Sequence, residues 1–277
     1  MSQKVNLNAY FERIGFAGSI APTLATLEAI HALHPAAIPF ENLDPVMGRP
    51  VLLDQASLEQ KMLHKGRGGY CFEHNTLLAN VLRDLDYTVR GHTARMLWGH
   101  PDGGAKMVSH MVLAVDIAGT SYLCDVGCSI FRLTAPLKLR DGVEQQVGAD
   151  LFRLTRQEAL WRLDVKFEDE WRGLYQFEPV ERSDSEIAEI NSLIETEYFN
   201  RALLFAARTD KEARYALTGK RLSIYRPGQE RERRYAEDVA ALKAMLADVF
   251  LITLPAAIDV LDPALQRVID AAPPPAA

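Results

Sequence analysis

The sequence predicts an α+β protein built from three consecutive segments. Residues 1–86 carry apolar side chains at helical spacing, residues 87–182 alternate apolar and polar side chains as half-buried strands do, and residues 183–277 mix both patterns. With 277 residues, 48% of them hydrophobic, the chain is long enough to bury a substantial core. We therefore expect a helical N-terminal part, a central antiparallel sheet or barrel, and a mixed C-terminal part.

The helices expected in the first segment are bounded by recognisable end signals. Apolar residues recur at helical spacing over residues 7–14 and 24–33, and these patterns are punctuated by Gly15 and Pro35. Residues 57–60, SLEQ, have the form of a capping box, which predicts a helix ending near the glycines at 66–69. A further helix is expected to begin at or beside Cys71, because apolar residues repeat at helical spacing from 78 to 85.

The other two segments show shorter elements. Strands are expected over residues 87–98, 110–117, 121–127 and 151–169, separated by turn signals such as PDGG and AGT. After residue 183 we expect a helix over 185–199, two short strands over 213–219 and 220–228, an amphipathic helix over 236–250, and a Pro/Ala tail.

Composition excludes several classes of function. The net charge of −6 leaves no basic excess for binding nucleic acid. The N-terminus lacks the apolar run of a secretory signal, and the most apolar late stretch is interrupted by Asp248, Pro255 and Asp259, so no membrane span is expected. Three cysteines without framework spacing are typical of reduced thiols in a cytoplasm, which is the predicted location.

Cys71 is the candidate nucleophile. It stands in the run RGGYCFEHN at a predicted helix N-terminus, a position that favours a reactive thiolate, and glycines 68 and 69 allow backbone amides to approach a reacting carbonyl as an oxyanion site. The same local pattern is equally compatible with a small apolar cysteine packed in the core.

His110 and Asp125 are the candidate partners of that cysteine, on adjacent strands of a predicted hairpin. A turn at residues 118–119 places His110 opposite Gly127, which makes Asp125 a diagonal neighbour on the same face, about 7 to 8 Å away. A register shifted by two residues puts His110 and Asp125 directly opposite, whereas a shift by one puts them on opposite faces. Alternatively, Asp125 belongs to a strand-ending turn and His110 is an ordinary sheet residue.

The remaining histidines and cysteines are weaker candidates. His31 and His34 fit the end of an amphipathic helix, and we expect the others on surfaces, namely His64, His74, His92 and His100. A metal site at Cys124 and Cys128 lacks a second ligand pair at the usual spacing, so no metal is predicted.

Several motifs together resemble the arylamine N-acetyltransferases, most strongly over residues 38–137. They are IPFENLD at 38–44, RGGYCFEHN at 67–75, SHMVLAV at 109–115, DVG at 125–127 and TAPL at 134–137. The order and separations of Cys71, His110 and Asp125 are also similar to those of the family. The resemblance implies a helical bundle (1–86) carrying the nucleophile, a β-barrel (87–182) carrying histidine and aspartate, and an α/β lid (183–277), around a cysteine-protease-like core.

The implied reaction is a ping-pong transfer of acetyl from acetyl coenzyme A, through a thioester on Cys71, to an arylamine or arylhydrazine. His110 would take the thiol proton and Asp125 would hold His110. The resemblance further implies acyl-donor contacts at Trp98, Ser109 and Gly127, acceptor contacts at Phe40 and Phe199, and a brace between Glu41 and Arg67, although Phe40 is equally compatible with core packing.

One departure from the family pattern concerns the residue after DVG, where the family usually has an aromatic residue and this chain has Cys128. We expect Cys128 to line the acceptor pocket and to change acceptor selectivity. The alternatives are an amide synthase that shares every motif, a cysteine hydrolase or transglutaminase-like enzyme, and a binding protein whose triad is vestigial.

Overall fold

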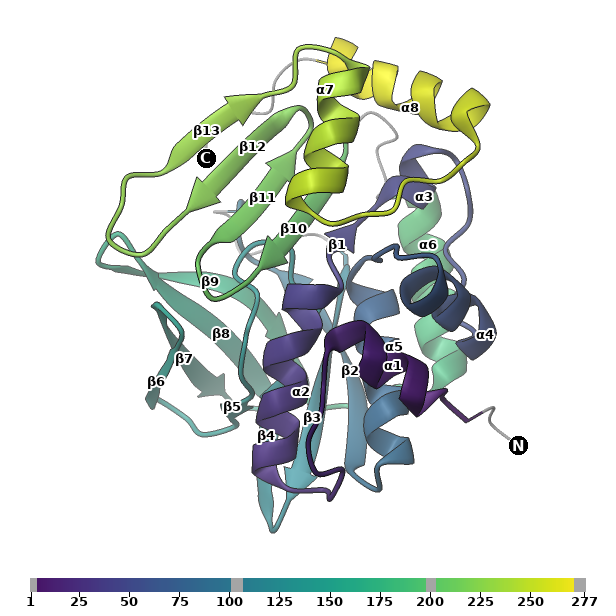
Figure 1. The fold of residues 1–277 in the computed structure, drawn as a ribbon. Helices are drawn as coiled ribbons and strands as arrows, with labels where there is room; N and C mark the ends of the chain where they lie inside the picture. Colours follow the sequence, from purple (N-terminus) through teal and green to yellow (C-terminus); the bar gives the residue numbers. More distant parts are fainter. Residues whose placement is uncertain (1–3, 101–106, 198–202, 272–277) are drawn as a thin grey trace.

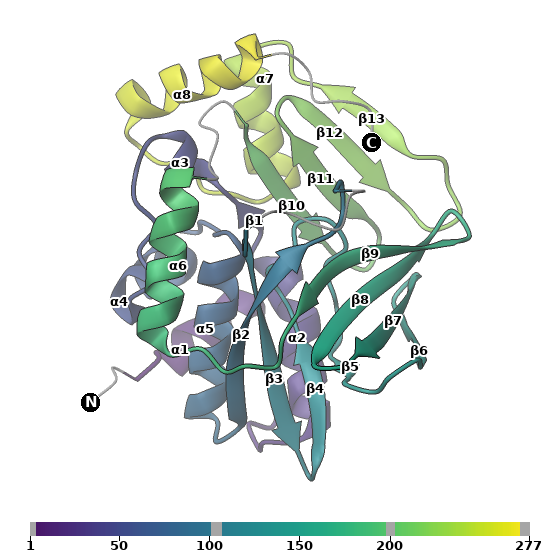
Figure 2. The same cartoon turned by 180° about the vertical axis from the view of Figure 1, so that it is seen from behind.

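A helical bundle and two antiparallel sheets make up the fold of the computed structural model, which describes residues 4–100, 107–197 and 203–271 (Figures 1 and 2). The helices are α1 Leu7–Ile14, α2 Leu24–Ala37, α3 Leu43–Val46, α4 Gln55–Leu58, α5 Cys71–Asp84, α6 Asp184–Glu197, α7 Val239–Ala244 and α8 Ile258–Asp270. Two π-helical segments, Glu59–His64 and Met245–Val249, extend α4 and α7.

The strands fall into two sheets. The eight-stranded sheet has the order β5-β4-β3-β2-β9-β8-β7-β6, and the five-stranded sheet has the order β1-β10-β11-β12-β13. Their bounds are β1 Phe40–Glu41, β2 Thr88–Met96, β3 His110–Ile117, β4 Thr120–Cys124, β5 Leu137–Lys138, β6 Glu144–Val147, β7 Asp150–Gln157, β8 Leu160–Phe167, β9 Glu170–Phe177, β10 Phe205–Thr209, β11 Arg214–Thr218, β12 Arg221–Tyr225 and β13 Glu232–Tyr235.

The larger sheet is a nearly closed barrel, in agreement with the predicted fold class. Its two edge strands, β5 and β6, are bridged by the side chain of Gln145, which accepts from the amide of Lys138 at 2.8 Å and donates to its carbonyl at 2.9 Å. One core fills the barrel with apolar residues from β2, β3, β7, β8 and β9. A sheet closed in this way keeps its edges occupied.

Elements distant in sequence are joined in both remaining parts of the molecule. Strand β1 comes from the N-terminal segment but pairs with β10 of the five-stranded sheet, and α6 packs Ile187 and Ile194 into the core around α5 (Figure 2). The division into 1–86, 87–182 and 183–277 stays a prediction, and these contacts cross both of its boundaries.

The predicted helix ends need three corrections. The α4 helix begins at Gln55 because Asp54 is its N-cap and accepts the Ser57 amide at 3.0 Å, so SLEQ is not the capping box. Pro35 lies inside the last turn of α2, which continues to Ala37. Residues 258–270, predicted to lie beyond the last helix, form α8.

Helix α8 contains Pro263 and buries an apolar stripe. The buried residues are Leu261, Ala264, Leu265 and Val268, at spacings of a helical face. Within the described residues, none of the helices combines the length and the apolar character that a membrane span needs.

A chain of buried polar side chains runs through the helical bundle. The Nδ1 atom of His34 lies 2.8 Å from the Tyr10 hydroxyl, and its Nε2 atom lies 2.8 Å from Nδ1 of His74. Since His74 Nε2 faces the carbonyl of Pro39 at 3.0 Å, it must donate. The direction of the other two bonds follows: His34 donates to His74, and Tyr10 donates to His34.

The prediction of surface positions is therefore wrong for His74, which is fully buried, and also for His92, which is 1% exposed and lies 2.9 Å from the carbonyl of Val180. His64 and His100 are exposed as expected. Burial lowers the pKa of His34 and of His74 well below the ordinary value, because the charged rings would lose their hydration; Arg132 and neighbouring rings act in the same direction.

Acid should therefore destabilise the fold before it protonates these rings. Below a pH of about 6.5 the unfolded histidines take up protons that the folded ones do not, so stability is lost as the pH falls from there. Between pH 7 and 5.5 we expect a loss of about 1 kcal/mol for each of His34 and His74.

Urea unfolding of the His74→Gln variant should show a loss smaller by about 1 kcal/mol, since glutamine can accept from His34 and donate to Pro39 without titrating. The exposed His64→Gln variant is the control and should keep the full pH dependence. A His74→Gln variant that keeps it as well would contradict the assignment.

Candidate active site

Cys71 is the first residue of α5, as the sequence predicts. The Tyr70 amide donates to the Glu73 carboxylate at 2.9 Å, which satisfies one of the open donors at the helix start. The thiol of Cys71 is 5% exposed and its sulfur lies 3.6 Å from the carbonyl oxygen of Ser109. The nucleophile candidate is thus held at a helix N-terminus directly beside the residue that precedes β3.

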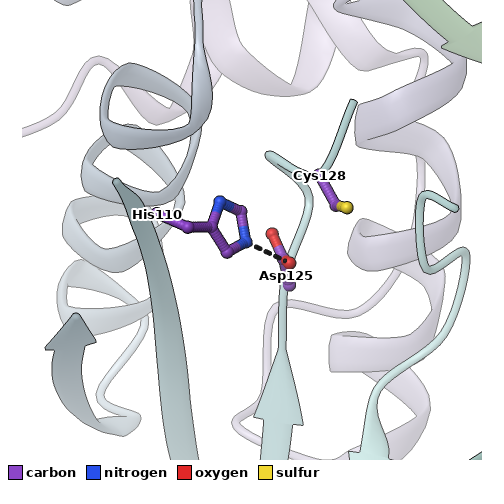
Figure 3. Close-up of side chains that lie close together, drawn as sticks. All are labelled: His110, Asp125 and Cys128. Atoms are coloured by element: carbon purple, nitrogen blue, oxygen red, sulfur yellow. Dashed lines mark hydrogen bonds and ion pairs between the residues drawn. The ribbon is translucent and has the colours of Figure 1, made fainter. Parts of the chain in front are cut away.

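His110 and Asp125 form a buried pair (Figure 3). The observed register of β3 and β4 pairs Ile117 with Thr120 and Leu113 with Cys124, which is the register expected for a turn at residues 118–119. Asp125 follows the last residue of β4, and its Oδ2 atom lies 2.7 Å from Nε2 of His110. The diagonal placement predicted from the hairpin therefore brings the two side chains into direct contact.

The pair is an ion pair. Burial would lower the pKa of His110, but the charge of Asp125 and the hydrogen bond to it outweigh this, so the pKa is raised well above its ordinary value. The thiol of Cys71 adds a further hydrogen bond that raises it. Burial would likewise raise the pKa of Asp125, yet His110, Asn75 and the Gly127 amide lower it. With Nε2 held by Asp125, Nδ1 of His110 is left for the thiol.

Asn75 fastens the nucleophile helix to the hairpin that carries the other two residues. Its amide nitrogen donates to the Met111 carbonyl at 2.7 Å and to Oδ1 of Asp125 at 3.0 Å, and its oxygen accepts from the Val126 amide at 3.2 Å. Asn75 belongs to the run RGGYCFEHN, and its role is not predicted from the sequence. An asparagine four residues after the nucleophile, on the same helical face, was the available signal.

Gly127 lies where the loop after β4 touches the start of α5. A Cβ atom at this position would stand 2.7 Å from Cα of Cys71 and 2.9 Å from the side-chain nitrogen Nδ2 of Asn75. The absence of a side chain is therefore required by close packing against the nucleophile. The acyl-donor contact predicted for Gly127 stays a prediction.

Glycines 68 and 69 are also explained by packing. A Cβ at Gly68 would stand 1.8 Å from the carbonyl oxygen of Pro39, and one at Gly69 would stand 2.8 Å from Cβ of Glu73. The amide of Gly69 donates to Pro39 at 3.4 Å. The oxyanion site expected near glycines 68 and 69 stays a prediction.

The predicted brace between Glu41 and Arg67 is present. Arg67 Nε donates to Glu41 at 2.7 Å, and a second ion pair joins Arg67 to Asp44 at 3.3 Å. Lys61 contacts Asp44 and Glu73, so the cluster reaches the first turn of α5. Burial opposes the charge of Glu41, but Arg67 and Lys61 together lower its pKa to about 2.

Ser109 and Cys128, two of the other predicted site residues, lie next to the pair of His110 and Asp125, whereas Phe40 packs against His74. Ser109 precedes His110, and the ligand atoms of His110, Asp125 and Cys128 all lie within 4.8 Å of one another. Phe40 is 8% exposed and stacks on His74, with ring centroids 6.4 Å apart.

Trp98 belongs to the barrel core and not to the core around Cys71. Its ring meets those of Phe131 and Phe167 edge-on, at centroid distances of 5.0 and 5.6 Å. The predicted position Phe199 lies outside the described residues.

Two further residues support the site and were missed. His31 Nε2 accepts from the backbone amide of Asp125 at 3.2 Å, and burial lowers the pKa of His31 to about 4, so the ring is neutral. Arg132 is fully enclosed and donates to backbone carbonyls of Pro35, Ile38, Val126 and Ala207. Both come from segments that approach the site only in the folded chain, so no local pattern in the sequence marks them.

All three thiols are free and buried in the structure, and they differ in their surroundings. Burial and the charge of Asp125 raise the pKa of Cys124 and of Cys128. Cys71 alone shares a hydrogen bond with the ring of His110. The arrangement thus suits acyl transfer through a thiolate on Cys71, with His110 as acid and base and Asp125 as its orienting group.

Comparison with known proteins points to the same chemistry. A sequence profile of the N-acetyltransferase family matches residues 23–258. The arylamine N-acetyltransferase of Mycolicibacterium smegmatis is 38% identical over 249 residues, covering 87% of this chain and 90% of the relative, and that of Escherichia coli is 32% identical over 247 residues, covering 88% of each.

Solved structures agree in fold over nearly the whole chain. The arylamine N-acetyltransferase of Mycobacterium marinum has a TM-score of 0.89 and 35% identity, covering 95% of this chain and 100% of that one. The structure of the same protein in complex with CoA has a TM-score of 0.88, also at 35% identity, with coverages of 95% and 99%.

Replacing Asp125 by asparagine should disable the imidazole while keeping its size. The change removes the charge that raises the pKa of His110 and offers a group that favours the wrong tautomer; in a serine protease triad this change lowers turnover by about 10⁴. We expect slower alkylation of Cys71 by iodoacetamide at neutral pH and a pH profile shifted from that of the unchanged protein.

The matched control is Asp116→Asn, on the same hairpin, where Asp116 pairs with Arg90 away from the site. It should leave the alkylation profile unchanged. An Asp125→Asn variant with the original profile would show that the triad is misassigned.

Proposed function

Because the chain belongs to the arylamine N-acetyltransferase family, we propose that Cys71 carries the acetyl group as a thioester between acetyl-CoA and the acceptor amine. The chain is an acyltransferase that moves acetyl from acetyl-CoA to arylamines. The observation that supports the role of Cys71 is its position at the start of α5, hydrogen-bonded to a buried ion pair of His110 and Asp125.

The first half-reaction forms the thioester. Cys71 reacts as a thiolate whose proton is held at Nδ1 of His110, and its sulfur attacks the carbonyl carbon of the acetyl thioester. The C–S bond to coenzyme A then breaks, and His110 returns the proton to the departing thiolate. One thioester replaces another, so little free energy separates the two states and a sulfur nucleophile suits this donor.

The second half-reaction transfers acetyl to the amine. The amine nitrogen attacks the carbonyl of acetyl-Cys71, His110 receives the proton that the nitrogen loses, and the C–S bond to Cys71 breaks. Asp125 keeps the imidazole in one tautomer and stabilises its charged form in both half-reactions. Since the first product leaves before the amine reacts, the order is ping-pong.

The surroundings of Cys71 fit a polar acyl donor. The hydroxyl of Ser109 is buried and has no hydrogen-bond partner within the described residues, next to the carbonyl that the Cys71 thiol contacts. A buried hydroxyl without a partner is costly unless a ligand completes its hydrogen bonding. This supports Ser109 as a contact of acetyl-CoA, and we assign Trp98 and Gly127 to the same substrate.

Phe40, Cys128 and Phe199 are our proposed contacts of the acceptor, which is an arylamine and, as we propose, also an arylhydrazine. Phe40 and Cys128 lie on either side of the nucleophile in sequence and next to it in the fold, since Phe40 forms a β-bridge with Gly69 and Cys128 follows Gly127. We further propose that the enzyme works in the cytoplasm on small molecules, without a nucleic acid or membrane partner, as its net charge of −6 indicates.

Mixing the protein with acetyl-CoA in the absence of amine tests the thioester. Intact mass should increase by one acetyl group, peptide mapping should place it on Cys71, and an added arylamine should remove it. The Cys71→Ser variant should fold but carry no thioester, whereas Cys124→Ser, which removes another buried thiol, should be acetylated normally.

Two outcomes would overturn this assignment. Acetylation of Cys124 or Cys128 in the unchanged protein would place the nucleophile elsewhere. Steady release of free acetate at the same rate with and without amine would indicate a hydrolase that uses the same three residues.

Replacing Cys128 by phenylalanine should change acceptor selection. An aromatic ring contributes about 0.5 to 1.5 kcal/mol through ring pairing beyond area burial, so Cys128→Phe should bind small flat arylamines more tightly and exclude bulky ones. We expect a lower acceptor KM and a reordered kcat/KM, with the rate of Cys71 acetylation nearly unchanged.

Measuring the two half-reactions separately makes the result unambiguous. An unchanged ranking of acceptors, or a large loss in the acetylation step, would show that Cys128 does not line the acceptor pocket. The control is Cys124→Ser, which changes a second buried thiol, in β4.

A further inference from the structure

Three side chains of different chemistry lie close together: the imidazole of His110, the carboxylate of Asp125 and the thiol of Cys128 (Figure 3). One ligand atom from each lies within 4.8 Å of the others, and all three residues are buried. Nitrogen, oxygen and sulfur are the donors by which proteins hold Zn²⁺. We propose that His110, Asp125 and Cys128 form an inhibitory binding site for zinc or a similar thiophilic divalent cation.

The geometry needs only small movements to close around a cation. With metal–ligand bonds of about 2.0 to 2.3 Å, donors of a tetrahedral zinc site stand about 3.5 Å apart. The Nε2 and Oδ2 atoms of the pair are 2.7 Å apart and would separate slightly, while the sulfur of Cys128 would approach. Cys128 lies in the irregular loop between β4 and β5, where no strand pairing fixes its backbone.

Binding leaves the net charge of the buried site unchanged. Before binding, His110 carries a proton on Nε2 toward Asp125, and Cys128 is a protonated thiol because burial raises its pKa. The cation replaces both protons: the Nε2–H and S–H bonds break, two metal–ligand bonds form, and two protons leave as one divalent ion enters. An exchange without added charge avoids the large cost of burying a new ion.

The other charged groups near the site do not favour the two protons over the divalent cation. Arg132 is the nearby cation, since the charges of Asp125 and Cys128 act on its pKa, and it repels two protons and one divalent ion to a similar degree. His31, on the backbone of Asp125, is neutral.

A buried hydroxyl also lies next to these three side chains. The hydroxyl of Tyr175 is fully buried, and a hydrogen bond to the Asp125 carboxylate is among the causes that raise its pKa. Burial raises the pKa of Tyr175, and the charges of Asp125 and Cys128 add to it, so the hydroxyl lies near both. Its ring is 5.0 Å from that of His110. This hydroxyl can donate to a water molecule in the fourth position of a zinc site.

The cation would stop the reaction by occupying the atoms that orient the base. With Nε2 and Oδ2 bound to metal, Asp125 no longer stabilises a charged imidazole, and His110 cannot cycle as acid and base. This consequence rests on the proposed role of His110, whereas the binding site itself rests on the three donors alone. The proposed site depends on Cys128, because the aromatic residue that the family usually has at this position would supply no sulfur ligand.

Cobalt(II) is a suitable probe because a cobalt–thiolate bond gives a charge-transfer absorption in the near ultraviolet. Titration with Co²⁺ should produce this band in the unchanged protein, in Cys71→Ser and in the control Cys124→Ser. The band should be absent in Cys128→Ser and in Cys128→Ala, two variants whose folding is checked by circular dichroism. A band that persists in the Cys128 variants and disappears in Cys71→Ser would place the cation on the nucleophile and overturn the proposal, as would the absence of any band.

Inhibition is measured on the first half-reaction. Zn²⁺ should slow acetylation of Cys71, and EDTA should restore it. Cys128→Ser should need at least about ten times more Zn²⁺ for the same degree of inhibition, since lost interactions at metal sites typically cost 10- to 100-fold in affinity. Equal inhibition of both proteins would overturn the proposal. A cobalt band without any acetylation of Cys71 would leave the metal site intact and refute the proposed function instead.

Discussion

Contact between the start of α5 and the loop after β4 is the constraint on which the active site depends. At Gly127 the two backbones approach so closely that a single Cβ atom would stand 2.7 Å from Cα of Cys71. Asn75 spans the same contact with hydrogen bonds to Met111, Asp125 and Val126. These contacts hold helix α5 and the β3–β4 hairpin in the arrangement that brings Cys71, His110 and Asp125 together.

The charged groups around this contact fix the positions of the chain segments but add little to the free energy of folding. Buried ion pairs such as those of Arg67 and His110 gain in attraction roughly what they lose in hydration, so they add little to the free energy of folding. Removing one partner, however, leaves an unpaired charge in the interior, which is strongly destabilising. Arg67 and Lys61 hold the segment before Cys71 in this way, because alternative positions of the loop would leave Glu41 or Glu73 without a cation.

The sequence predicts the parts of the site that depend on local pattern. Cys71 at a helix start follows from the glycines before it and the apolar spacing after it, and the contact of His110 with Asp125 follows from the turn that sets the hairpin register. What cannot be read locally is which polar residues the folded chain encloses. His74 and His92 stand in patterns typical of surfaces, yet packing of α2, α5 and β9 buries them, and only the tertiary contacts of Arg132 reveal its position. The same limit applies to the packing of Gly68 and Gly69, since Pro39, which both contact, lies in a different segment.

Arg132 completes the electrostatics of the site. Its guanidinium joins the end of α2, the loop after β4 and strand β10 through carbonyl oxygens, and within the described residues it has no carboxylate partner. Burial lowers its pKa only to about 10, so it stays charged at neutral pH. Together with the balanced pair of His110 and Asp125, it gives the buried site one net positive charge. A thiolate on Cys71 and the oxyanion formed when it attacks a thioester each carry one negative charge. The guanidinium of Arg132 therefore balances the negative charge of the thiolate and of the oxyanion that follows it.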